Sequence, residues 1–220
     1  MIRAIPFDGD GTLANSVATS PERFFAAAAM RGLPVTREIL AQKGIIPRIG
    51  GKAISKFWPG ENVDAFFRQW EELDILFNFE PIPGARAALE ILRSRHYQMS
   101  VLSNRNNRTL DPLMKKLGLE HLFWPIYGTE GRKFMKPDPR SAGPLLKIFA
   151  EKLGISREEA LFVGDSAEDD WPVARDNGMI FLGVLTGVSA REEFLAGGVG
   201  AENIIASVAD LPAWLEKYDR

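Results

Sequence analysis

The composition of this 220-residue chain excludes several classes of protein. Its 27 Lys and Arg residues against 29 Asp and Glu residues give a formal net charge of −2, so no general attraction to nucleic acid or to an anionic membrane is expected. The absence of Cys excludes disulfide bonds, thiol catalysis and Cys-ligated metals. With no leader-like start and no apolar run long enough to cross a bilayer, the chain is expected to be cytoplasmic.

Short apolar runs separated by helical patterns predict an α/β fold. Residues 110–117 and 145–153 repeat apolar side chains at helical spacing, and each pattern stops at a glycine. This alternation predicts a Rossmann-like core of three layers, in which helices cover both faces of a mostly parallel sheet. The predicted strands end at Phe7, Leu102, Tyr127, Val163 and Val184, with a last short strand at Asn203 to Ala206.

Residues 17–79 break this alternation and have helical patterns throughout. Ser20 and Thr36 have the character of helix starts, and residues 63–77 keep one apolar face over several turns. We expect residues 17–79 to form a small all-helical domain inserted into a core of residues 1–16 and 80–220. Four aromatic residues are expected to form the core of this small domain: Trp58, Phe66, Phe67 and Trp70.

Two carboxylates follow the first predicted strand. Asp8 and Asp10 stand one residue apart, where glycines permit a turn. One carboxylate can attack phosphorus, and a second carboxylate two residues on can handle the proton of the leaving group. Because both would repel a phosphate dianion, the site needs a cation, and Mg²⁺ bridging carboxylate and phosphate oxygens meets this need.

Further reactive groups follow along the chain. Asp165 comes directly after an apolar run, and Asp169 lies one helical turn beyond it. Ser103 offers a hydroxyl that can bond a phosphoryl oxygen, and Lys136 offers an ammonium in a loop stiffened by prolines. Because open α/β sheets bind ligands at the carboxyl ends of their strands, we expect these four residues to meet the two N-terminal aspartates.

Taken in order, these segments resemble the four motifs of the haloacid dehalogenase superfamily, and residues 82–89 and 119–123 are similar to its phosphoglycolate phosphatase-like branch. The resemblance implies a Mg²⁺-dependent phosphomonoesterase that hydrolyses a small phosphorylated metabolite through an aspartyl phosphate, with phosphoglycolate as one candidate substrate. It also implies that the helical insertion is a mobile cap over the site.

The resemblance assigns roles to individual residues. Asp8 would be the nucleophile and Asp10 the general acid and base, while Ser103 and Lys136 would hold the phosphoryl group. The metal ligands would be Asp8, the backbone carbonyl of Asp10 and Asp165, with Asp169 either a direct ligand or just outside the ligand sphere. Apart from these roles, we expect Thr12, Asn104, Arg48 and Lys52 to bind substrate.

The substrate contacts of the insertion rest on a basic, flexible cluster at residues 48–52. One interpretation is a specificity loop in which Arg48 and Lys52 meet an anionic part of the substrate when the cap closes. The other is an ordinary loop between helices.

Two further functions share the fold. A phosphosugar mutase of the β-phosphoglucomutase type would keep both N-terminal aspartates, although residues 17–79 contain no His to match the one in its cap. A non-catalytic phosphate-binding or metal-binding regulator is the alternative from another class. In each case the expected partner is a small phosphorylated metabolite, with no nucleic acid and no membrane, and the chain is expected to be a monomer or homodimer.

Three positions complete the expectations. Pro6 lies inside the first predicted strand, where it removes a hydrogen bond of the ladder. Asp170 is interpreted as a solvated neighbour of Asp169, because consecutive helix residues do not share a face. Glu130 either orients Lys136 or lies on the surface.

Overall fold

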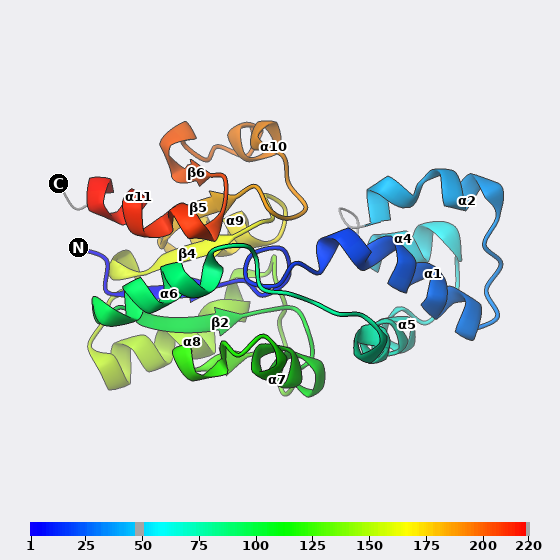
Figure 1. Cartoon of the computed structure of the whole chain (residues 1–220), viewed down its shortest axis with the longest axis horizontal. Coiled ribbons are helices and arrows are strands. Elements are labelled where there is room, and N and C mark those ends of the chain that lie inside the picture. Colours follow the sequence, from blue (N-terminus) through cyan, green and yellow to red (C-terminus); the bar gives the residue numbers. More distant parts are fainter. Residues whose placement is uncertain (47–50, 219–220) are drawn as a thin grey trace. The chain divides into compact units, whose positions relative to one another are not determined.

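The computed structural model describes residues 1–46 and 51–218. The chain folds into two compact units, one made of Met1–Asn15 and Glu80–Arg220 and the other of Ser16–Phe79. We call the first the core unit and the second the helical unit (Figure 1). In the part of the chain described here, no helix combines the length and the apolar character that a membrane span requires.

A six-stranded parallel sheet forms the centre of the core unit, with the strands in the order β3-β2-β1-β4-β5-β6. The predicted α/β fold is confirmed. Because β1 lies between β2 and β4, the segments that follow these three strands meet at one edge of the sheet. The strands are β1 (Ala4–Phe7), β2 (Gln98–Leu102), β3 (Ile126–Tyr127), β4 (Leu161–Gly164), β5 (Ile180–Val184) and β6 (Ile204–Ile205).

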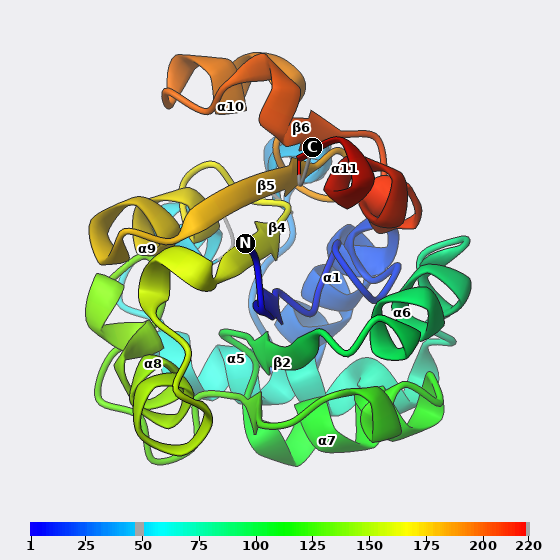
Figure 2. The same cartoon turned by 90° about the vertical axis from the view of Figure 1, so that its left-hand side faces the viewer.

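Helices cover both faces of this sheet. Figure 2 shows α8 and α9 on one face and α6 and α11 on the other. On the first face, side chains of α8, α9 and α10 share one buried apolar cluster with Phe162 of β4 and Phe181 of β5. The helices of the core unit are α6 (Ala85–Ser94), α7 (Asn107–Lys116), α8 (Gly143–Ile148), α9 (Asp170–Asn177), α10 (Arg191–Ala196) and α11 (Leu211–Tyr218).

The helical unit has an apolar core of its own, and Phe24 lies at its centre. The ring centroid of Phe24 lies 5.3 Å from that of Trp58 and 5.0 Å from that of Phe66. Trp70 is buried in the same cluster and Phe67 packs against it, which confirms the predicted aromatic core. The helices are α1 (Ser20–Met30), α2 (Arg37–Ala41), α4 (Gly51–Phe57) and α5 (Val63–Glu72).

Short turns of other helix types connect these elements. One π-helical turn, Phe149–Leu153, extends α8. The 3₁₀ turns are Val17–Thr19, Lys43–Ile45, Leu73–Leu76, Glu120–Leu122, Pro139–Ala142, Arg157–Glu159, Ala201–Asn203 and Val208–Asp210.

Pro6 lies inside β1, and the sheet adapts to it on one side only. The pairing of β1 with β2 continues through Pro6, which lies opposite Ser100. The next residue but one, Asp8, donates its N–H to Val163 O on β4 at 2.9 Å. Since alternate residues of a strand point their amide groups to the same neighbour, the missing N–H of Pro6 falls on the β4 side. There the pairing is reduced to Phe7 with Val163 and an isolated bridge between Ala4 and Ala160.

The two chain segments that connect to the helical unit lie side by side within the core unit. Asn15 donates its N–H to Glu80 O at 2.9 Å, and Ile82 donates its N–H to Leu13 O at 2.9 Å. Ala14 and Pro81 form an antiparallel bridge between these bonds. The chain therefore leaves and re-enters the core unit at one point.

Candidate active site

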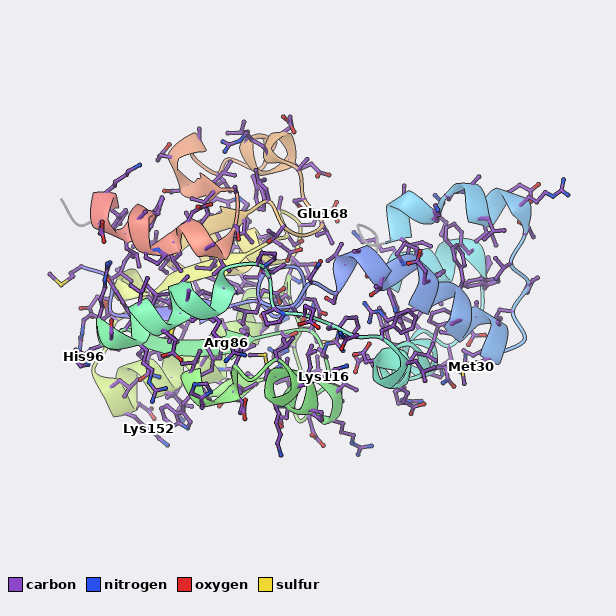
Figure 3. All side chains as sticks on the ribbon, in the orientation of Figure 1. Met30, Arg86, His96, Lys116, Lys152 and Glu168 are labelled. Atoms are coloured by element: carbon purple, nitrogen blue, oxygen red, sulfur yellow. The ribbon has the colours of Figure 1, made fainter. Side chains whose placement is uncertain are left out.

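The site lies where β1, β2 and β4 end. Asp8 follows β1 and Asp165 follows β4, and the N–H of Asp8 is bonded across to the main chain of β4. Figure 3 shows His96 at one end of the core unit and Glu168, from the loop after β4, at the other. His96 therefore lies far from the carboxyl ends of these strands.

Three buried carboxylates meet at this edge of the sheet. Asp8, Asp165 and Asp170 each place one oxygen within 4.8 Å of the others. Lys136 enters the same group, because its Nζ lies 2.5 Å from Asp8 Oδ1 and 2.5 Å from Asp170 Oδ1. All four side chains are buried. We call these four residues the acidic cluster.

Burial controls the protonation of the acidic cluster. It raises the pKa of Asp8 to about 6, although the ammonium of Lys136 partly offsets the effect. Burial, and then the charges of Asp8 and Asp170, raise the pKa of Asp165 well above its ordinary value. Burial alone would lower the pKa of Lys136, but the carboxylates of Asp170 and Asp8 outweigh it and raise that pKa. Lys136 is therefore charged, while each carboxylate is costly to ionise.

This charge balance fits a divalent metal ion. With all three carboxylates ionised they would carry −3 against the +1 of Lys136, which would leave the acidic cluster a net charge of −2. Carboxylate oxygens are the ligands that Mg²⁺ prefers. One divalent cation would neutralise the acidic cluster and remove the electrostatic cost that raises the carboxylate pKa values.

The loop after β5 fixes Asp165, and this loop is absent from the sequence-based prediction. Val188 donates its N–H to Asp165 Oδ2 at 2.8 Å, and the hydroxyl of Thr186 donates to Gly11 O at 2.6 Å. Between them, a Cβ on Gly187 would lie only 1.7 Å from Asp165 Oδ2, so no larger residue fits without displacing the carboxylate. The loop therefore fixes the position of the Asp165 carboxylate through its Oδ2.

Asp170, not Asp169, is the residue of the α9 segment that joins the acidic cluster. The interpretation of Asp170 as a solvated neighbour is wrong, because this residue is fully buried. Its Oδ2 accepts the N–H of Ser166 at 3.0 Å, which turns the side chain back toward the sheet. Asp169 precedes the helix and is half-buried. Its role as a metal ligand stays a prediction that this geometry does not favour.

Ser103 and Asn104, at the end of β2, are both held to other parts of the site. The hydroxyl of Ser103 accepts the N–H of Arg105 at 3.1 Å, and a Cβ on Gly9 would lie 3.5 Å from that oxygen. The amide of Asn104 makes two bonds to the main chain of Lys136, at 2.8 and 2.9 Å. Asn104 thus positions the Lys136 loop, and its contact with substrate stays a prediction.

Asp10 is held by a residue that sequence reasoning missed. Arg105 donates from Nε to Asp10 Oδ2 at 3.0 Å and from Nη2 to Asp10 Oδ1 at 2.6 Å. The Arg105 side chain is 4% exposed and that of Asp10 is 33% exposed. The only sequence signal was a cation two residues after Ser103, and surface loops commonly contain such a residue.

The remaining predicted residues lie in different surroundings. Thr12 is fully buried, and its hydroxyl has no hydrogen-bond partner among residues 1–46 and 51–218. Lys52 is an exposed residue of α4, while Arg48 lies outside the described residues. Glu130 does not orient Lys136, because it is exposed and its carboxylate lies 3.9 Å from Arg108 Nε.

Comparison with known proteins identifies the family. The haloacid dehalogenase-like hydrolase family matches residues 5–184 of this chain. A phosphoglycolate phosphatase of Chromobacterium violaceum is 31% identical, over 96% of this chain and 95% of the relative. One from Haemophilus influenzae is 29% identical, over 76% of this chain and 79% of the relative.

The fold comparison agrees with the sequence comparison. A crystal structure of a haloacid dehalogenase-like hydrolase from Bacteroides fragilis superposes with a TM-score of 0.79 at 25% identity, covering 96% of this chain and all of the other. The predicted superfamily and enzyme class are therefore confirmed. The chain belongs to the haloacid dehalogenase-like hydrolase family, in which it is a phosphoric monoester hydrolase similar to the phosphoglycolate phosphatases.

Proposed function

We propose that this chain is a Mg²⁺-dependent phosphomonoesterase that hydrolyses a small phosphorylated metabolite through an aspartyl phosphate on Asp8. The acidic cluster is the observation that carries the proposal, since a buried Asp8 beside a charged Lys136 is suited to meet a phosphate ester. Phosphoglycolate is the first substrate to test, because relatives at 31% and 29% identity are phosphoglycolate phosphatases.

The Mg²⁺ ligands in this proposal are Asp8, Asp165 and the backbone carbonyl of Asp10. Asp170 takes part through its bond to Lys136 and its place in the acidic cluster. When bound, Mg²⁺ would supply the positive charge that lets the phosphate approach ionised carboxylates.

The chemistry follows from the remaining side chains. Lys136 and the hydroxyl of Ser103 bind phosphoryl oxygens, and a carboxylate oxygen of Asp8 attacks phosphorus as the bond to the leaving oxygen breaks. Asp10 donates its proton to that oxygen. The ionised Asp10 then takes a proton from water as this water attacks the phosphorus of the aspartyl phosphate, which releases phosphate and restores Asp8.

The helical unit acts as the cap in this proposal and selects the substrate. Lys52, with Arg48, would contact an anionic or hydroxylated part of the natural substrate that a generic ester lacks. Lys52→Ala is then expected to lower kcat/KM for the natural substrate by about tenfold and to change hydrolysis of p-nitrophenyl phosphate little. Lys43→Ala, on another exposed position of the helical unit, is the matched control. Equal, small effects of Lys52→Ala on both substrates would remove Lys52 from this role.

A substrate panel with metal control tests the proposal directly. Release of inorganic phosphate is measured from phosphoglycolate, sugar phosphates, nucleotides and p-nitrophenyl phosphate. Activity should stop in EDTA and return with Mg²⁺, whereas Ca²⁺ should substitute poorly because its larger shell misplaces nucleophile and phosphate. Full activity in EDTA would contradict the metal mechanism. Isomerisation of a sugar phosphate without phosphate release would favour the mutase alternative.

Asp8→Asn tests the nucleophile in the same assay. The amide has nearly the same size but cannot form the acyl phosphate, so turnover should be abolished. Turnover comparable to that of the wild type would remove Asp8 from its role.

A further inference from the structure

The guanidinium of Arg105 donates a hydrogen bond to each carboxylate oxygen of Asp10. The proposed reaction gives Arg105 no role. We infer that Arg105 is a positioning residue that fixes the carboxylate of Asp10 for proton transfer. The inference rests on the proposed role of Asp10 as general acid and base. Arg105 itself touches neither the phosphoryl group nor the metal ion in this assignment.

The contact has the geometry of a fixed support. Two parallel N–H groups of a guanidinium match the two oxygens of a carboxylate and define its plane, which a single bond from an ammonium does not. The distances are 3.0 Å from Nε and 2.6 Å from Nη2. Because Arg105 is almost fully buried, its side chain has little freedom to follow a moving partner.

The main chain of Arg105 is anchored at the phosphoryl site. Its N–H is bonded to Ser103 Oγ at 3.1 Å, and its carbonyl accepts the N–H of Thr129 at 2.9 Å. Ser103 in turn donates its own N–H to Tyr127 O on β3 at 2.9 Å. Through Arg105, these bonds fix the position of Asp10, in the loop after β1, relative to the end of β2. The phosphoryl group is expected to bind at this end of β2.

The need for such a support follows from the exposure of Asp10. Its side chain is 33% exposed, in a loop where Gly9 and Gly11 flank it. A proton-transfer group works only within hydrogen-bond reach of the leaving oxygen and of the attacking water. When the Asp10 side chain is held in one rotamer, it does not have to find the reactive position in each turnover. A carboxylate oxygen has two lone pairs, so an oxygen that accepts one hydrogen bond can also take the proton.

A purely structural role for the ion pair makes a different prediction. If Arg105 only joined the loops after β1 and β2, its loss would disturb Asp8, Ser103 and Asp10 together. Capture of the phosphoryl group and hydrolysis of the aspartyl phosphate would then slow in parallel. If Arg105 positions Asp10, only the steps that move a proton should slow.

Pre-steady-state kinetics of Arg105→Gln separates the two cases. With p-nitrophenyl phosphate the leaving group needs little protonation, so the first equivalent of p-nitrophenol should appear at a rate within about threefold of the wild type. Hydrolysis of the aspartyl phosphate needs the base, so steady-state turnover should fall by about tenfold to a hundredfold, and a burst should become visible. Turnover of an alkyl phosphate should fall at least as much, with KM and the Mg²⁺ requirement little changed.

Two further variants guard against misfolding and test the mechanism. Arg105→Lys keeps the charge without the two-pronged contact and should recover only part of the lost turnover. In the Asp10→Asn background, Arg105→Gln should cause little further loss, because the two residues act as one unit. Arg108→Gln, on an exposed residue of α7, is the matched control and should behave as the wild type.

The outcomes distinguish the inference from the proposed function. A parallel loss of burst rate and turnover in both Arg105 variants, or losses that add fully to those of Asp10→Asn, would overturn the inference while the function stands. If Asp10→Asn slows the first-turnover release of good and poor leaving groups equally, the proposed role of Asp10 as general acid fails, and the inference fails with it. Thermal unfolding of each variant shows whether the fold is retained.

Discussion

Replacing the proposed nucleophile is expected to stabilise the metal-free protein. Burial raises the pKa of Asp8 from 3.8 to about 6, with Lys136 partly offsetting the effect. A carboxyl group whose pKa is higher in the folded state than in the unfolded state binds its proton more tightly when folded. Its contribution to stability is therefore present below pH 3.8 and is lost as the pH rises through about 6. Asp8→Asn has no carboxyl group to ionise at this position, so it should keep the stability that the wild type loses as the pH rises.

The magnitude follows from the pKa difference. The pKa of Asp8 is about 6 in the folded state and 3.8 in the unfolded state. This difference corresponds to about 3 kcal/mol in the free energy of unfolding. Asp8 is buried, so solvent screening does not reduce this figure. In the absence of metal, Asp8→Asn should be more stable than the wild type by about 3 kcal/mol at pH 8 and by about half as much at pH 5.

Urea unfolding in EDTA at the two pH values measures this difference. Asp111→Asn, at an exposed position of α7, is the control for the amide substitution itself. Saturating Mg²⁺ should raise the stability of the wild type more than that of Asp8→Asn, because the wild type keeps the full ligand set. If Asp8→Asn is no more stable than the wild type at pH 8 in EDTA, the electrostatic account of the acidic cluster is refuted.

Three other changes have expected outcomes. Asp165→Ala should raise the Mg²⁺ concentration needed for half-maximal activity sharply or abolish activity, and an unchanged requirement in a Mg²⁺ titration would exclude Asp165 as a ligand. Gly187→Ala should weaken Mg²⁺ binding by about tenfold or more, because its Cβ would lie 1.7 Å from Asp165 Oδ2, and calorimetric titration with Mg²⁺ measures this. His96→Gly should raise the free energy of unfolding by about 0.5–1 kcal/mol, since His96 has a φ of 64° after α6, and urea unfolding with unchanged activity would bear this out.

The sequence predicted the sheet and its reactive edge because both depend on local patterns. Apolar runs that end at a polar residue mark the carboxyl ends of strands, so this pattern assigns Asp8, Ser103 and Asp165 to one edge of the sheet. Periodic apolar residues likewise indicated the helical unit and its aromatic core.

The residues that the sequence did not reveal depend on contacts between distant segments. Asp170 joins the acidic cluster and Asp169 does not, because the N–H of Ser166 donates a hydrogen bond to the carboxylate of Asp170. Arg105 pairs with a residue 95 positions earlier, and Val188 with one 23 positions earlier. Their local sequences resemble ordinary surface loops, so only the folded chain identifies their partners.

The hydrogen bond between Asn15 and Glu80 joins the two ends of the core unit at the point where the helical unit is inserted. The antiparallel pairing of residues 13–15 with residues 80–82 is the start of a hairpin, which a turn of about two residues can close. Because the chain ends of the core unit already meet there, an insertion of any length adds only a slowly growing loop-closure entropy. If the helical unit selects the substrate as proposed, exchanging residues 16–79 as a cassette should change substrate preference, while the sheet that holds the acidic cluster keeps its connections.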